Sequence, residues 1–311
     1  PFYIGDGTIR TILFAGLDAD VMVMTIPDLD NYSLKRSKHP VHYVYVPHNL
    51  TSTHMVFRKG AFDAFDTILC AGPHHVAEAR EAESLYGLPP RSLVEVGYVK
   101  LDAIRETLRS EAPPPATKTI RVLITPSWPP HNLLEIVGID LIEALLSEGY
   151  EVVVRPHRDT KRLAGKSLAE LQDRFQERPN FALADGSTGR TAFNEADVLI
   201  TDWSGSAISF AFSRERPVLS IDIPRKVLNP EYERFSNEPL EVTIRDKIGV
   251  VLQPDDIADA PRLVATLHDR REEFAHSIQK ERNRWVFNID NSAAVGASHL
   301  AKLAEGGQSL E

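Results

Sequence analysis

Two polar turns carry the residues best suited to chemistry. The first is Thr201-Asp202-Trp203-Ser204-Gly205-Ser206, which follows an apolar run at 198–200 and precedes a second apolar pattern at 207–212. This order predicts a buried strand, a tight turn and a helix. Unpaired N–H groups at a helix start, serine hydroxyls and a glycine that admits a ligand closely suit a phosphate group. The alternative is an ordinary helix cap, for which Asp and Ser are common residues.

The second turn is Arg155-Pro156-His157, directly after a very apolar run at 150–154. Arginine offers a planar, permanently charged fork for phosphate oxygens. Histidine can donate a hydrogen bond or move a proton near neutral pH. The alternative is a surface arginine and a histidine held in a turn by proline. We favour the functional interpretation because the pair ends a buried strand.

Further polar residues also follow predicted strands. His48 comes after the run at 41–46, and Ser127 after the run at 120–125. Ligands of open α/β sheets bind outside the carboxyl ends of the strands, so this repeated placement indicates a binding region more strongly than one motif does. His48 could act as a base for group transfer; a histidine satisfied by its own loop is the alternative. We leave His54 and the pair at 74–75 outside this set.

Short apolar runs alternate with helical patterns, which implies an α/β fold with parallel sheets. Strands are expected at 20–25, 41–46, 67–70, 93–96, 120–125, 150–154, 181–184, 198–200, 217–221 and 249–252. Helices are expected at 6–18, 74–86, 131–146, 161–175, about 207–212, and from 255 onward. The charged stretch 269–284 is predicted to be a solvated helix face.

The segment 110–117, with the proline run 113–115 at its centre, is the clearest linker, since the prolines can neither continue a helix nor enter a central strand. It divides the chain into two α/β domains, whose strand ends we expect to face a cleft. The chain begins at Pro1 rather than Met. We therefore expect the N-terminal domain, and any acceptor site on it, to be incomplete.

Composition excludes several classes of protein. The 311 residues carry a net charge of −9, which does not support a general nucleic-acid surface. The single cysteine, Cys70, rules out an intrachain disulfide and favours a reducing, cytoplasmic location. No stretch has the length and apolarity of a membrane span. Metal motifs, a P-loop, a Gly-x-Gly-x-x-Gly fingerprint and a Gly-x-Ser-x-Gly elbow are all absent from the sequence.

Taken together, the motifs resemble those of the CDP-glycerol glycerophosphotransferase family, the teichoic-acid polymerase and primase group. The resemblance rests on five segments in order, with a fainter match at Asn288-x-Asp290-x-Ser292. The five are Val46-Pro47-His48-Asn49, Gly97-Tyr98-Val99-Lys100-Leu101-Asp102, Thr125-Pro126-Ser127-Trp128, Arg155-Pro156-His157 and Thr201-Asp202-Trp203-Ser204-Gly205-Ser206. The family has His-Gly at the first and Thr-Asp-Tyr-Ser-Ser at the last. Asn49 and Gly205 therefore depart from its pattern, and Arg58 or Lys59 would replace a family lysine.

The resemblance implies a GT-B fold of two Rossmann-like domains. The acceptor-side domain would be 1–114, the nucleotide-donor domain 115–275, and helices at 276–311 would cross back. Glycerol phosphate would pass from CDP-glycerol, bound as substrate, to a hydroxyl of a polymer or lipid-linked acceptor, with release of CMP. No metal is assigned.

Roles for individual residues follow from the same resemblance. Ser204, Gly205 and Ser206, with Ser127 beside them, would hold the diphosphate, and Asp202 would orient that turn or contact donor hydroxyls. Arg155 and His157 would neutralise developing charge, and His48 would take the proton of the acceptor hydroxyl. Lipid-linked acceptors would be consistent with peripheral contact with the inner face of the cell membrane. Lys35, Arg36 and Lys38 form a weak basic patch for such contact, although a solvated loop is the favoured interpretation of these residues.

Other functions fit the same motifs. A GT-B nucleotide-sugar glycosyltransferase of surface-polysaccharide biosynthesis would need the same diphosphate ligands, as would a sugar-nucleotide 2-epimerase. An inactive GT-B-like binding module is a third alternative, given the departures at Asn49 and Gly205. The sequence does not separate these functions.

Overall fold

The computed structural model describes residues 7–32, 34–112, 117–184 and 188–307. The expected proline linker at 113–115 lies outside this part of the chain. The chain divides into two compact units: Pro1–Asp102, Val227–Pro239 and Trp285–Glu311 form the first, and Ala103–Lys226 and Leu240–Arg284 the second. These limits differ from the sequence-based ones. The first passage between units lies at 102–103 rather than 114–115, and 227–239 belongs to the first unit.

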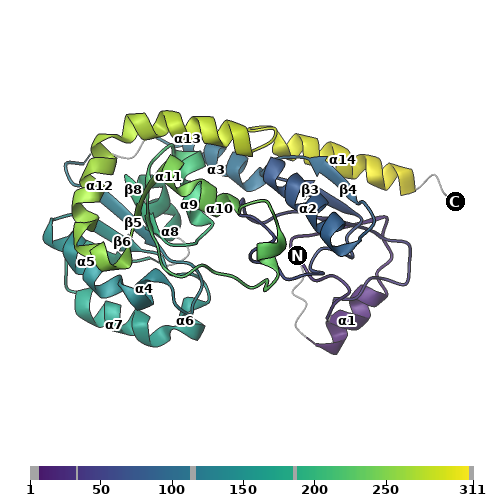
Figure 1. Cartoon of the computed structure of the whole chain (residues 1–311), viewed down its shortest axis with the longest axis horizontal. Helices are drawn as coiled ribbons and strands as arrows, with labels where there is room; N and C mark the ends of the chain where they lie inside the picture. The colour runs from purple at the N-terminus through teal and green to yellow at the C-terminus, as the bar shows by residue number, and fades with distance from the viewer. Residues whose placement is uncertain (1–6, 33, 113–116, 185–187, 308–311) are drawn as a thin grey trace. The chain divides into compact units, whose positions relative to one another are not determined.

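The first unit is built on a four-stranded parallel sheet (Figure 1). Its strands follow the order β1-β2-β3-β4. In chain order its elements are α1 (Thr8–Ala15), β1 (Val21–Met24), β2 (His42–Tyr45), β3 (Thr67–Cys70), α2 (Pro73–Tyr86), β4 (Ser92–Glu95), the start of α3 (Val99–Ser110), the 3-10 turn η1 (Tyr232–Arg234) and α14 (Ser292–Gly307).

Alternation along the strands explains why helices cover both faces of this sheet. Successive side chains of a strand point to opposite faces. Tyr43 and Tyr45 pack in a cluster that includes Val76 of α2. Val44, between them, packs with Val295 and other residues of α14. Both faces are therefore apolar, which explains why the strands read as continuous hydrophobic runs.

Two of the motif segments meet in one junction of the first unit. The Asp102 carboxylate accepts hydrogen bonds from the backbone N–H groups of Asp290, at 2.9 Å, and Ser292, at 2.8 Å. Gly97 has φ +99°, and a Cβ there would meet the Phe287 carbonyl oxygen at 2.2 Å. The junction therefore needs a glycine, and it holds the start of α14 against the end of β4.

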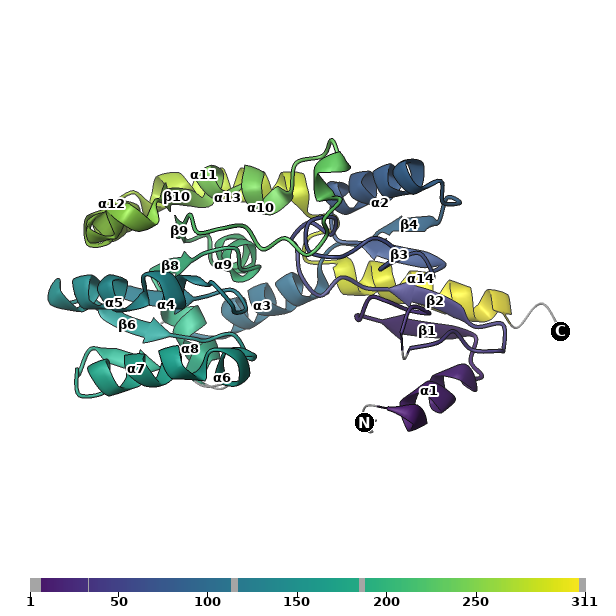
Figure 2. The ribbon, with the colours of Figure 1, turned by 60° about the horizontal axis from the view of Figure 1, so that its bottom comes forward.

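The second unit is a six-stranded parallel sheet with helices on both faces (Figure 2). Its strands are β5 (Arg121–Thr125), β6 (Glu151–Val154), β7 (Phe181–Leu183), β8 (Val198–Thr201), β9 (Val218–Ile221) and β10 (Gly249–Leu252). Its helices are the rest of α3, then α4 (Leu133–Ile136), α5 (Gly138–Ser147), α6 (Thr160–Leu163), α7 (Gly165–Phe175), α8 (Thr188–Glu195), α9 (Ser206–Arg214), α10 (Leu240–Thr243), α11 (Arg245–Ile248), η2 (Pro254–Asp259), α12 (Ala260–Asp269) and α13 (Arg271–Trp285).

The strand order of the second sheet is β10-β9-β8-β5-β6-β7. Numbered within the unit, this is the 3-2-1-4-5-6 order of a Rossmann sheet read from its far edge. The direction of winding reverses between β5 and β8, which pair in parallel from Val122↔Val198 to Thr125↔Thr201. In open α/β sheets the crevice outside the carboxyl ends of such strands is where ligands bind.

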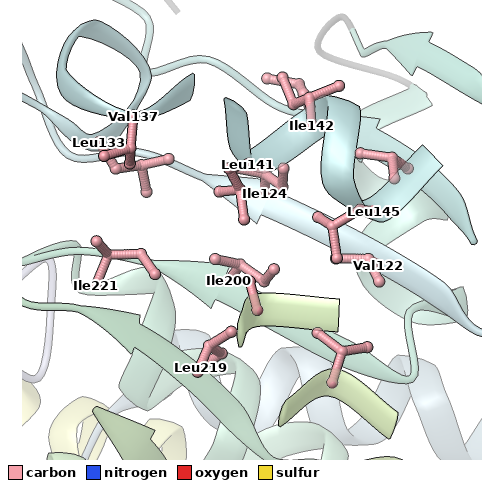
Figure 3. Close-up of a cluster of buried hydrophobic side chains, with 14 of the residues drawn as sticks. Val122, Ile124, Leu133, Val137, Leu141, Ile142, Leu145, Ile200, Leu219 and Ile221 are labelled. Atoms are coloured by element: carbon pink, nitrogen blue, oxygen red, sulfur yellow. The ribbon is translucent and has the colours of Figure 1, made fainter. Parts of the chain in front are cut away.

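One large apolar core supports this sheet (Figure 3). Val122 and Ile124 of β5 pack with Ile200 of β8 against Leu141 and Leu145 of α5, all of them fully or almost fully buried. Burial of one such side chain contributes about 1.5–3 kcal/mol. Leu171 and Phe175 of α7, and Val264 and Leu267 of α12, extend the same core.

The structure confirms all ten predicted strands and changes two of the helices. The helix expected at 131–146 is split into α4 and α5 at Val137, whose φ of −132° is not helical. The helix expected at 161–175 is split at Ala164, with φ −137°. A glycine follows each break, Gly138 and Gly165, and glycine weakens a helix interior, so the apolar periodicity alone does not predict one continuous helix. None of the helices in the described ranges is both long and apolar enough to cross a membrane.

The charged stretch at 269–284 is only in part the solvated face that its composition predicts. Glu281 and Arg282 are buried within α13. Nη1 of Arg282 donates to the Phe212 carbonyl oxygen at 2.8 Å and to Oε1 of Glu215 at 2.7 Å. These bonds satisfy the last turn of α9, where carbonyl groups lack partners within the helix. The charged stretch therefore contains two buried residues, one of which, Arg282, joins α13 to α9.

Two buried histidines at the start of α2 are held neutral. Nε2 of His75 contacts the Thr51 carbonyl oxygen at 3.1 Å, and its Nδ1 accepts from the Ala71 N–H at 3.3 Å. Nε2 of His74 contacts the Leu50 carbonyl oxygen at 2.9 Å. Burial lowers the pKa of both residues below the ordinary value of 6.5. Both rings therefore act as neutral donors that join the 50–51 loop to α2.

We expect stability to fall as pH drops below about 6.5. A histidine with a lowered folded-state pKa stabilises the fold fully above its unfolded-state pKa, and that contribution is lost as pH falls. Each histidine adds a slope of up to about 1.4 kcal/mol per pH unit. The His75→Gln variant keeps an amide that can donate and accept hydrogen bonds in the same places but does not titrate. In urea unfolding between pH 7.5 and 5, its free energy of unfolding should therefore depend less steeply on pH, by the contribution of one histidine. The exposed His276→Gln is the control, and an unchanged slope in His75→Gln would contradict the assignment.

Candidate functional site

Three strand ends of the second unit carry the candidate binding residues. Ser127 follows β5, Arg155 follows β6, and Asp202 follows β8. Because β8, β5 and β6 are adjacent in the sheet, these residues lie at one edge, on both sides of the point where winding reverses. This is the position that an open α/β sheet offers to a ligand.

Asp202 joins the ends of β5 and β8. Its Oδ1 accepts from the Ser127 N–H at 2.7 Å, and its Oδ2 accepts from Ser127 Oγ at 3.0 Å and from the Leu133 N–H at 3.0 Å. The residue is 3% exposed. Burial raises its pKa, although the hydrogen bonds from Leu133 and Ser127 and the charge of Lys226 act in the opposite direction. Asp202 therefore positions the loop after β5 rather than capping α9.

Asn132 completes this loop. Its side-chain oxygen accepts from the Leu134 and Glu135 N–H groups, and the Glu135 carboxylate accepts from the Asn132 N–H, which together form a capping box. The Asn132 amide also donates to the Ser127 carbonyl oxygen at 3.3 Å. The fully buried Asn132 and Asp202 thus hold Ser127 from both sides.

Lys226 is a site residue that the sequence interpretation missed. It is 6% exposed, and its Nζ contacts the Pro130 carbonyl oxygen and lies 5.1 Å from the ring centre of Trp128. Burial lowers its pKa, while the carboxylates of Asp202 and Glu135 act to raise it. The available signal was its place in a polar segment directly after β9, a fourth strand end at this edge.

Arg155 and Ser206 are brought together at the start of α9. Nη2 of Arg155 donates to Oγ of Ser206 at 3.2 Å, and the guanidinium carbon lies 5.4 Å from the ring centre of Phe193. Gly189 of α8 admits this side chain, since a Cβ there would meet Cδ of Arg155 at 2.7 Å. Burial lowers the arginine pKa, but a guanidinium remains charged at neutral pH. A cation, a hydroxyl and a helix N-terminus therefore converge.

Ser204 and Gly205 shape the turn before α9. Oγ of Ser204 accepts from the Ser206 N–H at 3.3 Å, and the Ser204 carbonyl accepts from the Ala207 N–H at 3.0 Å. Ser204 thus takes part in the capping that was weighed as the alternative, and its hydroxyl hydrogen can still be donated. Gly205 has φ −58°. Its backbone needs no glycine, so its lack of a side chain affects only the space beside the turn.

His157 lies one residue beyond the Arg155-Pro156 pair and is about one third exposed. Its Nδ1 accepts from the Asp159 N–H at 3.2 Å, which places the ring hydrogen on Nε2. Burial lowers its pKa, opposed by the charge of Asp159. His157 is therefore a neutral hydrogen-bond donor through Nε2.

His48 belongs to the first unit and is exposed. Its Nδ1 lies 3.3 Å from the Thr25 carbonyl oxygen, and its own carbonyl accepts from the Tyr98 hydroxyl at 2.6 Å. In its neutral form, a ring that donates through Nδ1 carries an acceptor lone pair on Nε2. Tyr98 of the Gly97–Asp102 motif therefore holds the His48 loop, which links two motif segments that lie 50 residues apart.

The structure thus groups the predicted residues in two pairs, Ser127 with Asp202 and Arg155 with Ser206, on one sheet edge. Ser204 and Gly205 belong to the second pair's turn, and His157 interacts with Asp159 beside it. Among the described residues, no group of three or more His, Cys, Asp or Glu side chains is placed to hold a metal ion. The chemistry of this edge is that of an anion site built from one arginine, serine hydroxyls and a helix start.

No protein-family model matches the chain, and no curated protein matches it significantly. Solved structures do. A variant of the wall teichoic acid polymerase TagF soaked with CDPG matches with a TM-score of 0.57 and 16% identity, over 94% of this chain and 73% of that one. A UDP-GlcNAc 2-epimerase from Neisseria meningitidis bound to UDP-GlcNAc matches at 0.51 and 12%, over 84% and 70%.

A variant of S. aureus TarM, in complex with Fondaparinux, alpha-GlcNAc-glycerol and UDP, matches with a TM-score of 0.53 and 15% identity, over 92% of this chain and 56% of that one. Identities this low show the fold alone. With its two parallel-sheet units and its C-terminal helices, the chain has the GT-B fold.

Asp202→Ala should destabilise the second unit by about 3 kcal/mol. The change leaves the buried N–H groups of Ser127 and Leu133 without their acceptor, and each such loss costs about 1–3 kcal/mol. Urea unfolding followed by tryptophan fluorescence measures the effect, because Trp128 and Trp203 flank the site. The Asp202→Asn variant keeps one acceptor oxygen, so its free energy of unfolding should fall by less than that of Asp202→Ala. The exposed Asp173→Ala is the control and should change the free energy of unfolding by under about 0.5 kcal/mol. Equal effects at positions 202 and 173 would refute the structural role.

Proposed function

We propose that this chain is a transferase of cell-surface polymer synthesis that moves glycerol phosphate from CDP-glycerol to an acceptor hydroxyl. The observation that carries the proposal is the contact between Arg155 and Ser206 at the start of α9. A diphosphate placed there could receive hydrogen bonds from the guanidinium and the hydroxyls while the helix start stabilises its charge. The site lies at the topological switch point, where the GT-B fold offers room for a nucleotide.

The reaction requires charge stabilisation and one proton transfer. The acceptor oxygen bonds to the phosphorus that carries glycerol, the bond from this phosphorus to the bridging oxygen breaks, and CMP leaves with the bonding electrons. Arg155 stabilises the negative charge that develops on the departing phosphate. The acceptor hydroxyl meanwhile loses its proton to a base.

The tautomers of the two histidines suit opposite roles. His48, with Nδ1 at the Thr25 carbonyl, offers a basic Nε2 that could take the proton of the acceptor hydroxyl. His157, with Nδ1 at the Asp159 N–H, offers an Nε2–H that could donate to a phosphate oxygen. Asp202 is a positioning residue in this scheme, because its carboxylate oxygens are already bonded to Ser127 and Leu133.

The similar structures support a nucleotide donor and leave its identity open. One was soaked with CDPG, another holds UDP-GlcNAc and a third holds UDP. The motif resemblance favours the cytidine compound. A GT-B glycosyltransferase that uses a uridine nucleotide sugar is the second candidate, supported by the likeness to the UDP-bound structure.

Calorimetric titration should show binding of CDP-glycerol and CDP in preference to UDP-GlcNAc. Arg155→Ala and Ser206→Ala should each weaken CDP-glycerol binding by about tenfold or more, the loss expected for a charge-assisted hydrogen bond. Arg158→Ala is the matched control, since that side chain is 90% exposed and its nearest partner is Asp159. Preference for UDP-GlcNAc would replace the proposal with the glycosyltransferase. Absence of binding to every nucleotide would favour an inactive module.

His48→Ala should lower transfer by about 100-fold or more, because general bases contribute roughly 10²–10⁴ to a rate. CDP-glycerol binding should be retained, since the Arg155–Ser206 site belongs to the other unit. CMP release in the presence of a polymeric acceptor measures the reaction, with His276→Gln as control. Full activity of His48→Ala would mean that another group accepts the proton.

A further inference from the structure

A cavity of about 50 Å³ lies within the first unit, apart from the anion site. His54, Glu78 and Asn229 supply polar groups to its wall, and Phe57, Phe62 and Phe235 supply aromatic ones. Residues on the loop after β2, on α2 and in the 227–239 segment thus enclose one space. At roughly 10–15 Å³ for each water, it can hold about three to five waters or a compound of similar size.

Several buried polar atoms of this wall lack a hydrogen-bond partner within the described part of the chain: the ring nitrogens of His54, Oε1 of Glu78 and the Tyr86 hydroxyl. Among the described residues, none is placed to bond the buried Nε2 of His54. Its side chain is 2% exposed, and its ring stacks on Phe235 at 4.8 Å between centres. A buried nitrogen without a partner costs free energy, unless water or a ligand bonds to it. His74 and His75 differ from it, because carbonyl oxygens bind their Nε2 atoms.

Glu78 sets the orientation of His54. Its Oε2 accepts from the Thr53 N–H and the Thr53 hydroxyl, both at 2.7 Å, and lies 3.5 Å from Nδ1 of His54. Burial acts to raise the pKa of Glu78, but the neighbouring histidine side chains outweigh this effect and lower it. The Nε2 atom on the far side of the ring then needs a hydrogen-bonding partner, and a hydroxyl group can serve as donor or acceptor.

The charges around the cavity favour a neutral occupant. Arg58 is paired with Asp28 at 2.8 Å, and Arg91 with Glu83 at 3.3 Å. The ammonium group of Lys59 lies 4.4 Å from the ring centre of Tyr86. Each of these cations has a carboxylate or an aromatic ring as its neighbour. Among the described wall residues, none is therefore paired with a hydroxyl at a helix start, as Arg155 is with Ser206 beside α9. Aromatic rings instead suit the C–H groups of a polyhydroxylated carbon chain.

We propose that the cavity binds a small neutral polyol, of the size of glycerol, with one of its hydroxyl groups hydrogen-bonded to Nε2 of His54. Three carbons and three hydroxyls match the volume, and the rings of Phe57 and Phe235 flank the carbon chain. Phe57 also contacts His48 edge-on, with ring centres 6.1 Å apart. If the proposed function holds, the occupant is a glycerol unit of the acceptor chain, held next to the base. This last identification rests on that function, whereas the binding of polyol does not.

Nuclear magnetic resonance of the ¹⁵N-histidine-labelled full chain tests the proposal. Glycerol should shift the Nε2 resonance of His54 saturably, with a dissociation constant in the millimolar range expected of so small a ligand. 1,2-Propanediol, which lacks one hydroxyl, should bind more weakly. A linear, unsaturated response would overturn the proposal, as would a stronger response to 1-propanol than to glycerol, since the latter would identify an apolar cavity.

Two variants act on the site in different ways. His54→Gln should weaken glycerol binding about two- to tenfold, the worth of one hydrogen bond, monitored through His75. Ala82→Leu adds apolar bulk to the cavity wall without removing a polar group and should abolish binding. His276→Gln should leave binding unchanged. Normal binding in Ala82→Leu would place the glycerol elsewhere and refute the assignment.

Nucleotide titration of the same samples separates this proposal from the proposed function. Saturable glycerol binding without CDP-glycerol binding supports the polyol site and rejects the donor. CDP-glycerol binding without a His54 response rejects the polyol site and leaves the donor assignment intact. Glycerol 3-phosphate binding more tightly than glycerol at His54 would contradict the neutral character of the cavity.

Discussion

The carboxylate of Asp202 is the constraint on which the candidate site depends. It bonds to Ser127, which lies 75 residues earlier, and to the start of α4, so it ties together the loops that follow β5 and β8. Parallel strands whose winding reverses leave a crevice, and without a cross-link the two loops that line it could separate. A carboxylate can do this at low exposure because its acceptor positions are filled. The arginine, serine and helix start beside it then have a defined edge on which to act.

The motif segments divide into those that do chemistry and those that hold structure. Arg155 and Ser206 present polar atoms at the start of α9, as a phosphate site requires. Asp102 instead bonds to the backbone of Asp290 and Ser292, and Gly97 makes room for the chain at Phe287. The resemblance in these segments therefore reflects how α14 is attached to the first unit. A match of motifs in order is informative about fold even where its residues cannot reach a substrate.

The buried histidines His54, His74 and His75 of the first unit differ in the partner of their Nε2 atoms. His74 and His75 bind carbonyl oxygens and fasten the loop at 50–51 to α2. His54, beside the Glu78 carboxylate, lines the cavity, and its buried Nε2 has no partner among the described residues. Burial does not distinguish the three histidines, since all of them are almost fully covered. The partner of the Nε2 atom distinguishes them, because a buried nitrogen without a protein partner needs a ligand or water.

The sequence by itself determined the ten strands, the α/β class and the strand ends that carry polar residues, because these depend on local apolar runs and the turns that end them. Only the tertiary structure decided the strand order, the pairing of Asp202 with Ser127, and the place of 227–239 in the first unit, since these contacts join residues far apart in the chain. Glu281 and Arg282 lie in a stretch that the sequence predicts to be solvated, yet packing buries them, and it also buries Lys226. Likewise, nothing in the local sequence separates His54 from His74 and His75. Local pattern sets which elements form, whereas burial and hydrogen-bond satisfaction depend on which elements meet.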